Sequence, residues 1–246
     1  MKICLVGFGR LGSAIGKRLK RFYEMKVSTL PPTDELARKE GLEVVDLKTC
    51  INFGDVVIVS VEPSAMDSVL SQMEGLEKPL ISTAALYGLK EIRRKVKCGY
   101  RTMPSVTVEI GKSPVLVSER GGCNDEAVEE ILSKLGKPIW VKEEVLDAAL
   151  PVVGSGPAIH SLYYNSLVEA LVYAGVDRKL AEEMVKESVI GTMEFLKKYD
   201  PLEVRARVET PGGITVKMTV ELEKEGVFGS LSKIVGETGR ELRTRR

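Results

Sequence analysis

The chain has few of the residues that build metal centres and disulfide frameworks. Its 246 residues include one histidine, His160, so a histidine metal site or a Ser-His-Asp triad would depend on that residue alone. The four cysteines, Cys4, Cys50, Cys98 and Cys123, show no CxxC spacing and no neighbouring histidine. We therefore expect no metal site and no disulfide framework, and a reducing cytoplasm is the compartment that fits best.

An excess of charge of one sign and long apolar runs are also missing. The sequence contains 36 lysines and arginines against 35 aspartates and glutamates, a net charge of +1, which gives no electrostatic support for nucleic-acid binding. The apolar start at Ile3–Val6 is too short for a signal peptide or a membrane span, so we expect no membrane association. Glutamine and asparagine are scarce beside many lysines and glutamates, a composition typical of proteins from hot environments.

Strand-like and helix-like segments alternate through the first part of the chain. Parallel strands joined by helical crossovers give this order, so we expect an α/β domain with a mostly parallel sheet over residues 1–142. The predicted strands are Lys2–Val6, Lys26–Leu30, Val56–Val61, Pro79–Thr83, Val115–Val117 and Ile139–Val141, and the predicted helices are Ser13–Phe22, Asp34–Glu40, Ser64–Met73 and Asp125–Leu135.

The pattern changes to helix alone after about Lys142. One helix is predicted to begin at Pro157, a second spans Arg178–Lys198, and two more come after a Pro-Gly-Gly turn. We expect residues 143–246 to form an all-α domain. Its apolar faces are wide for so small a core, so we expect them to pair with a second copy of the chain in a homodimer.

A glycine-rich turn, Gly7-Phe8-Gly9-Arg10-Leu11-Gly12, directly follows the first predicted strand. In dinucleotide sites the first glycine permits a tight turn, the second lets the backbone approach the pyrophosphate, and the third lets helix pack on strand. The amino terminus of the next helix favours phosphate. We expect this turn to bind a dinucleotide, and the alternative is a tight turn in an inert sheet.

The end of the second predicted strand bears on which nicotinamide cofactor binds. NAD sites usually carry an acid there to hold the ribose 2′-hydroxyl, whereas this strand ends Val27-Ser28-Thr29-Leu30-Pro31. The hydroxyls of Ser28 and Thr29 could hold a 2′-phosphate. Arg10 and Lys48 could add positive charge, although each could equally be a solvated surface residue. We therefore expect NADP, with NAD as the alternative.

Two further turns of small residues open helices in the second part. Gly154-Ser155-Gly156-Pro157-Ala158 admits either a ligand or a neighbouring backbone. Thr210-Pro211-Gly212-Gly213-Ile214-Thr215 offers hydroxyls and backbone N–H groups at a helix start, which suit an anion the size of a carboxylate. A capped helix-to-helix turn is the alternative for the second motif.

In their order and spacing these three turns resemble those of pyrroline-5-carboxylate reductase, the enzyme that makes proline, and the resemblance spans nearly the whole chain. Further points of similarity are Val61 and Pro63, Ser82 with Ala84-Ala85, Arg101 with Met103-Pro104, and Glu169-Ala170. The chain departs from the family pattern at Glu62, Ser105 and Thr210, where the family usually has lysine, asparagine and serine.

The resemblance implies an N-terminal Rossmann domain and a C-terminal helical dimerisation domain, often assembled further into decamers. It places the substrate carboxylate at Thr210, Gly212, Gly213 and Thr215. Thr29, at the end of the second predicted strand, is expected to contact the cofactor as well. The expected cofactor-binding residues are therefore Gly7, Phe8, Gly9, Arg10, Leu11, Gly12, Thr29, Val61, Pro63, Ala84 and Ala85.

The implied reaction reduces the cyclic imine of 1-pyrroline-5-carboxylate to L-proline. A protonated cyclic imine is already electrophilic, so the protein mainly has to orient two bound molecules. Ser155 or Thr215 would at most polarise the imine nitrogen. Two alternatives stay open, a reductase of another cyclic imine and a non-enzymatic dinucleotide-binding regulator. A β-hydroxyacid dehydrogenase is disfavoured, because residues 157–176 contain no lysine.

Overall fold

The computed structural model describes residues 1–120 and 123–244. These residues form two compact units, one of Met1–Pro157 with the residues from Thr238 onward, and one of Ala158–Glu237. Every strand of the described residues belongs to the first unit, and the second is helical. The expected fold class, a mostly parallel α/β part followed by an all-helical part, is confirmed.

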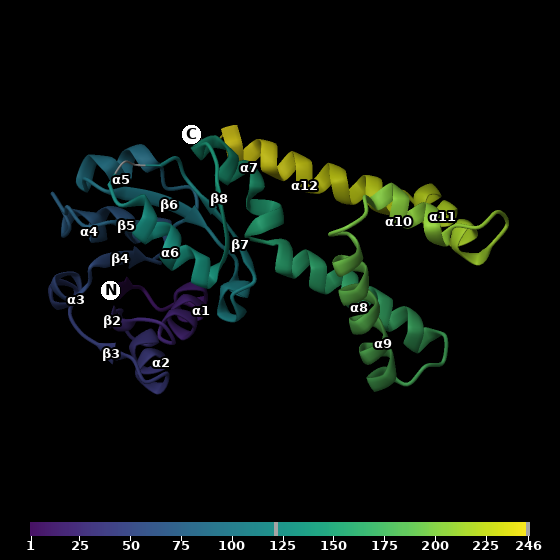
Figure 1. The fold of residues 1–246 in the computed structure, drawn as a ribbon, viewed down its shortest axis with the longest axis horizontal. Helices are drawn as coiled ribbons and strands as arrows, with labels where there is room; N and C mark the ends of the chain where they lie inside the picture. Colours follow the sequence, from purple (N-terminus) through teal and green to yellow (C-terminus); the bar gives the residue numbers. More distant parts are fainter. Residues whose placement is uncertain (121–122, 245–246) are drawn as a thin grey trace. The chain divides into compact units, whose positions relative to one another are not determined.

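The first unit is built on one sheet, which has eight strands in the described residues, in the order β3-β2-β1-β4-β5-β6-β7-β8 (Figure 1). The described pairings are parallel except for that of β6 with β7. The strand order reverses between β1 and β4, and such a switch point opens a crevice at the carboxyl ends of the strands. The strands are β1 (Lys2–Val6), β2 (Glu24–Ser28), β3 (Glu43–Val44), β4 (Val56–Val59), β5 (Leu80–Ser82), β6 (Gly99–Met103), β7 (Ser113–Val117) and β8 (Gly136–Trp140).

Helices cover both faces of this sheet, and alternate strand residues supply the two apolar layers. Leu5 and Ile58 face the side covered by α1, α2 and α6. Val57 and Val59 face the side covered by α3, α4 and α5. The helices of this unit are α1 (Arg10–Leu19), α2 (Thr33–Lys39), α3 (Leu47–Phe53), α4 (Met66–Ser71), α5 (Leu89–Lys95), α6 (Asp125–Leu135) and α7 (Glu143–Val153), with 3₁₀ turns η1 (Pro63–Ala65) and η2 (Val106–Ile110).

Several elements differ from the sequence expectation for identifiable reasons. Helix α1 begins at Arg10, inside the glycine turn, because Gly9 is its N-cap. Strand β2 ends at Ser28, so Thr29 lies one residue beyond it. The sequence pattern does not predict β6, because Arg101 puts a charge at the centre of a strand that is buried throughout. It also misses β3, α3, α5, α7 and α10.

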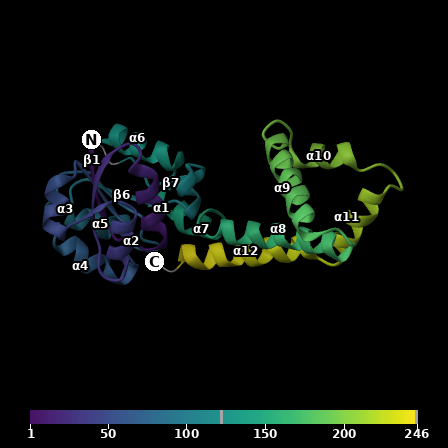
Figure 2. The same cartoon turned by 90° about the horizontal axis from the view of Figure 1, so that it is seen from below.

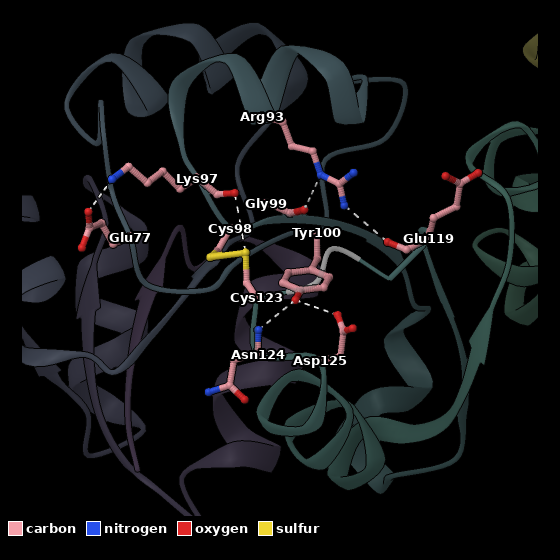
Figure 3. Close-up of a disulfide and its surroundings, with 10 residues drawn as sticks. All are labelled: Glu77, Arg93, Lys97, Cys98, Gly99, Tyr100, Glu119, Cys123, Asn124 and Asp125. Atoms are coloured by element: carbon pink, nitrogen blue, oxygen red, sulfur yellow. Dashed lines mark hydrogen bonds and ion pairs between the residues drawn. A yellow bond between two sulfur atoms is a disulfide. The ribbon is translucent and has the colours of Figure 1, made fainter.

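The expectation that the cysteines form no disulfides is wrong. Cys4 on β1 is bonded to Cys50 on α3, and Cys98 before β6 is bonded to Cys123 before α6 (Figure 3). The partners are 46 and 25 residues apart in the sequence. The spacing of cysteines in the sequence does not predict these pairs, because the partner cysteines come together only when the sheet and its helices fold.

The second unit consists of helices with a small core of their own. Val168, Ala181 and Val185 are its buried apolar residues, and they pack together where α8 and α9 meet. Large apolar side chains remain exposed, among them Tyr173 at 95% and Ile214 at 86%. The helices are α8 (Gly156–Tyr173), α9 (Arg178–Phe195), α10 (Pro201–Val208), α11 (Ile214–Lys224) and α12 (Val227–Thr244), of which α8 and α12 extend into the residues of the first unit.

One helical stretch, Glu143–Tyr173, is long and apolar enough to cross a membrane by length and composition alone. Only 22% of the apolar window in this stretch is buried inside the chain. An apolar face that pairs with another copy of the protein meets the same criterion, so the stretch does not by itself indicate a membrane protein.

Candidate functional site

The glycine turn after β1 is shaped by close backbone contacts. Gly7 has φ of +92°, and a Cβ there would collide with the carbonyl group of Ser60. A Cβ on Gly12 would collide with the carbonyl oxygen of Gly7. A Cβ on Gly9 would meet nothing within 4 Å. The turn therefore needs Gly7 and Gly12 to close, whereas the position of Gly9 leaves open space in front of the backbone.

That open space belongs to a groove of about 600 Å³ at the carboxyl ends of β1, β4 and β5. We call it the cofactor groove. It lies at the switch point of the sheet, where open α/β proteins bind dinucleotides. Its lining residues are Gly9, Arg10, Leu11, Ser60, Val61, Glu62, Pro63, Thr83, Ala84 and Ala85.

The structure brings seven of the expected cofactor residues to this groove: Gly9, Arg10, Leu11, Val61, Pro63, Ala84 and Ala85. Gly7 and Gly12 stand behind it and shape the turn. Phe8 does not line the groove, because its side chain is buried in the core at 1% exposure. An aromatic ring beside the first two glycines anchors the turn by packing.

Thr29 supports the glycine turn from the neighbouring strand. Its Oγ1 accepts a hydrogen bond from the Phe8 N–H at 3.2 Å and lies 2.6 Å from Thr33 Oγ1. The Gly7 N–H donates to the carbonyl of Ser28 at 2.8 Å. The end of β2 is thus tied to the turn through both backbone and hydroxyl, with Thr29 beside the first residues of the fingerprint.

The groove contains two hydroxyls, of Ser60 and Thr83, that sequence reasoning does not identify, and an acid, Glu62, that it names only as a departure from the family pattern. Thr83 Oγ1 donates to Ser60 Oγ at 3.1 Å, which links the ends of β4 and β5. Glu62 is an acid on the groove wall. Such residues could have been found from the sequence by the rule that side chains just after parallel strands gather at one edge of the sheet.

A second pocket, of about 240 Å³, shares Leu11, Thr83 and Ala85 with the cofactor groove. We call it the inner pocket. It places Ser155 and Gly154, which come after α7, beside the carboxyl end of β6. Its other lining residues are Thr102, Met103, Pro104, Ser105, Val106 and Leu150. The sequence-predicted Ser155 therefore lies at a pocket that shares part of its wall with the cofactor groove, a place where a reacting molecule can meet a bound dinucleotide.

The Pro-Gly-Gly motif forms the turn that joins α10 to α11 (Figure 2). The Gly213 N–H donates to the carbonyl of Thr210 at 2.9 Å, and Gly212 has φ of +72°. Proline at the second position and a positive-φ glycine at the third are the pattern of a type II turn. Gly213 caps α11 without a side-chain hydrogen bond, so the first turn of this helix presents backbone N–H groups beside the half-buried Thr215.

An ion-pair network braces the two helices that flank this turn. Arg205 on α10 lies 2.6 Å from Glu209 Oε1 and 2.6 Å from Glu223 Oε1 on α11. Thr219 Oγ1 donates to Glu209 at 2.7 Å. The Arg205 hydrogen bond, with a smaller contribution from Thr219, lowers the pKa of Glu209 below its usual value. The carboxylate form persists at neutral pH, and its contribution to stability is lost only as pH falls through the lowered pKa.

Family models match both parts of the chain. A model described as pyrroline-5-carboxylate reductase dimerisation matches residues 143–244. A model described as NADP oxidoreductase, coenzyme F420-dependent, matches residues 2–86. The first covers the helices that carry the Pro-Gly-Gly turn, and the second covers the glycine turn and all the lining residues of the cofactor groove.

Whole-chain relatives agree with these models. Pyrroline-5-carboxylate reductase of Aquifex aeolicus is 28% identical over 251 residues, covering 97% of this chain and 95% of that protein. The structure of 1-pyrroline-5-carboxylate reductase from Streptococcus pyogenes matches with a TM-score of 0.88 at 26% identity, covering 99% of this chain and 98% of that one. The structure of Plasmodium falciparum pyrroline carboxylate reductase with NADP bound also matches with a TM-score of 0.88, covering 99% of this chain and 97% of that one. At 22% identity this match shows a similar fold.

Proposed function

Because the chain belongs to the pyrroline-5-carboxylate reductase family, we propose that it reduces 1-pyrroline-5-carboxylate to L-proline with a nicotinamide cofactor, preferentially NADPH. The observation that carries this proposal is the cofactor groove, which shares Leu11, Thr83 and Ala85 with the inner pocket where Ser155 lies. The groove suits a dinucleotide and the inner pocket a small ring.

The residues of the groove fit a dinucleotide on structural grounds. Gly9 leaves space that a Cβ would fill, and it caps α1 without a side-chain hydrogen bond, so the helix amino terminus faces a phosphate-sized opening. Arg10 adds positive charge at the same place. Val61, Pro63, Ala84 and Ala85 offer small or apolar surfaces for the rest of the cofactor. When bound, NADPH supplies a hydride from its nicotinamide ring.

The chain's own contribution to the reaction is binding and orientation. Thr210, Gly212, Gly213 and Thr215 hold the substrate carboxylate through hydroxyls and backbone N–H groups at the start of α11. Ser155 or Thr215 would at most polarise the imine nitrogen. A protonated imine needs no further proton before hydride arrives, so holding the two reactants in near-attack geometry accounts for most of the acceleration.

The direct test is turnover. Purified protein mixed with 1-pyrroline-5-carboxylate and NADPH should oxidise the cofactor, measured by its loss of absorbance, and form one proline for each NADPH consumed. NADH should give a lower kcat/KM. Absence of turnover with either cofactor would refute the assignment, whereas turnover confined to other cyclic imines would keep the reaction class and change the substrate.

The Thr215→Ala variant tests the carboxylate site. Loss of one hydroxyl contact to a carboxylate costs about 1.5–3 kcal/mol, so KM for pyrroline-5-carboxylate should rise roughly tenfold to a hundredfold while KM for NADPH stays unchanged. Thr192→Val on α9 is the control, since its hydroxyl donates to the carbonyl of Ser188 within its own helix. If KM for NADPH rose and KM for pyrroline-5-carboxylate did not, Thr215 would not be a carboxylate-binding residue.

The helical domain supports a homodimer, and we propose that dimers assemble further into a decamer. Exposed apolar side chains of the second unit include Leu162 at 72% and Leu202 at 75%, and pairing would remove such surface from water.

We also propose a cytoplasmic location. Intracellular disulfides are characteristic of hyperthermophiles, which agrees with the scarcity of glutamine and asparagine.

A further inference from the structure

Arg101 is the largest fully buried side chain in the described part of the chain, at 1% exposure. It lies on β6, and a guanidinium stays charged even when buried, so its burial is costly unless the charge is paired. Its Nη1 lies 3.2 Å from Asp147 Oδ2, and its Nη2 contacts Asp147 Oδ1. The pair forms a two-pronged contact, a geometry that fixes orientation as well as distance. Asp147, on α7, is also 1% exposed.

A second acid extends this connection. Glu143, one turn earlier on α7, has its Oε1 3.3 Å from Arg101 Nη1. The same oxygen accepts a hydrogen bond from the Leu89 N–H at 2.6 Å, at the start of α5. Helix α7 is therefore held at two successive turns, by the buried Asp147 and by Glu143, whose side chain is 20% exposed.

The end of α7 depends on this hold because its own backbone is weakened there. Pro151 lies inside the helix four residues after Asp147, and proline has no N–H to donate to the carbonyl of Asp147. The last turn of α7 therefore lacks one of its backbone hydrogen bonds. This turn carries Leu150 and leads directly to Gly154 and Ser155, which line the inner pocket.

We propose that Arg101 is a positioning residue that acts through Asp147. By fixing α7 immediately before Pro151, the ion pair holds Ser155 at the inner pocket in the geometry the reaction needs. This inference rests on the proposed function, in which the inner pocket receives the imine. Neither Arg101 nor Asp147 lines the groove or the pocket, so neither touches the reactants.

The neighbouring residue on β6 provides a matched control. Tyr100 is also fully buried, but it faces the opposite side of the sheet, where its hydroxyl donates to Asp125 Oδ1 at 2.8 Å (Figure 3). Asp125 begins α6, which contributes no residue to the inner pocket. Tyr100→Phe removes a buried contact between β6 and a helix without touching α7.

The kinetic test compares the variants with the parent at a temperature where all are folded. Asp147→Asn removes the two-pronged partner of a buried charge and leaves Glu143, at 3.3 Å, to face it, so the double variant Arg101→Met/Asp147→Leu is included to remove both charges and preserve the fold. A misplacement of about 1 Å costs on the order of a hundredfold in rate, so both variants should lose kcat by about that factor. NADPH affinity should be retained, and Tyr100→Phe should keep the parental kcat. A parental kcat in the folded double variant would overturn the proposal.

A second measurement does not depend on turnover. The N–H groups of Gly154 and Ser155 both donate to the carbonyl of Leu150, at 2.9 and 3.0 Å, so their rates of amide hydrogen exchange report opening of the end of α7. In the Arg101→Met/Asp147→Leu variant these rates should rise roughly tenfold, as expected for a local opening, but not in Tyr100→Phe. Equal rates in the parent and in both variants would overturn the positioning role. If the parent protein turns over no imine, the proposed function fails while hydrogen exchange still decides the structural claim.

Discussion

Replacing Gly9 with alanine is expected to abolish measurable NADPH binding while leaving the protein folded. Gly9 has ordinary backbone angles, with φ of −70° and ψ of −160°, and its added Cβ would meet nothing within 4 Å of the protein. Loss of a glycine N-cap costs about 1 kcal/mol or less. The added methyl group would instead occupy the space through which a pyrophosphate approaches the backbone.

The expected loss of affinity is at least about a hundredfold, equivalent to about 2.8 kcal/mol. Titration of nicotinamide fluorescence or calorimetry would measure the dissociation constant, and thermal unfolding without cofactor would measure stability. Gly7→Ala is the contrasting variant. With its positive φ and the Ser60 carbonyl in the way, it should lose both stability and binding. Unchanged NADPH affinity in Gly9→Ala would show that the glycine turn is not the phosphate site.

Reduction of the two disulfides is expected to lower the stability of the first unit more than any single substitution of a surface residue. The bonds close loops with sequence separations of 46 and 25 residues. The chain-entropy estimate for loops of this length is about 3–4 kcal/mol for each bond, which corresponds to a fall in the unfolding midpoint of about 10 °C for each. Scanning calorimetry with and without a thiol reductant measures this shift.

Variants separate the two bonds. Cys4→Ala/Cys50→Ala removes the buried pair, and Cys98→Ser/Cys123→Ser removes the pair that reaches the surface. Each double variant should unfold at a lower temperature than the parent. Added reductant should lower the unfolding midpoint of each variant less than it lowers that of the parent, because one disulfide is already absent. None of the four cysteines lines the cofactor groove or the inner pocket, so NADPH affinity should be retained. Four reactive thiols in the denatured, unreduced parent would contradict the disulfide assignment.

The sequence predicts elements best where the local signals agree. Asp125–Leu135 is predicted with the bounds of α6, because its apolar residues recur at helical spacing and Asn124 is positioned to cap it. Lys2–Val6 is predicted with the bounds of β1 for the analogous reason, a continuous apolar run before a glycine turn. The glycine fingerprint is predicted from that run and the helix after it, and three of its residues, Gly9, Arg10 and Leu11, line the groove.

The failures share a different cause. Strand β6 contains Arg101 at its centre, and a charged residue in a strand normally indicates a solvated edge or a loop. The arginine can be buried only because Asp147, 46 residues later, pairs with it. Helix α5 is mostly charged and buries only Leu89 and Ile92, so periodicity alone does not identify it. The hydroxyls of Ser60 and Thr83 gain meaning only when β4 and β5 lie side by side.

The sequence by itself determined the two-part fold class, the dinucleotide fingerprint at the first strand and the three small-residue turns that carry the family resemblance. Each of these features depends on residues close together in the chain, because the spacing of apolar residues and the backbone freedom of glycine act over short distances in sequence. The tertiary structure alone decided the pairing of the cysteines, the burial of Arg101 against Asp147 and the placing of Ser155 at the inner pocket. These depend on contacts between residues far apart in sequence, which only the packing of α3, α6 and α7 on the sheet brings within bonding distance.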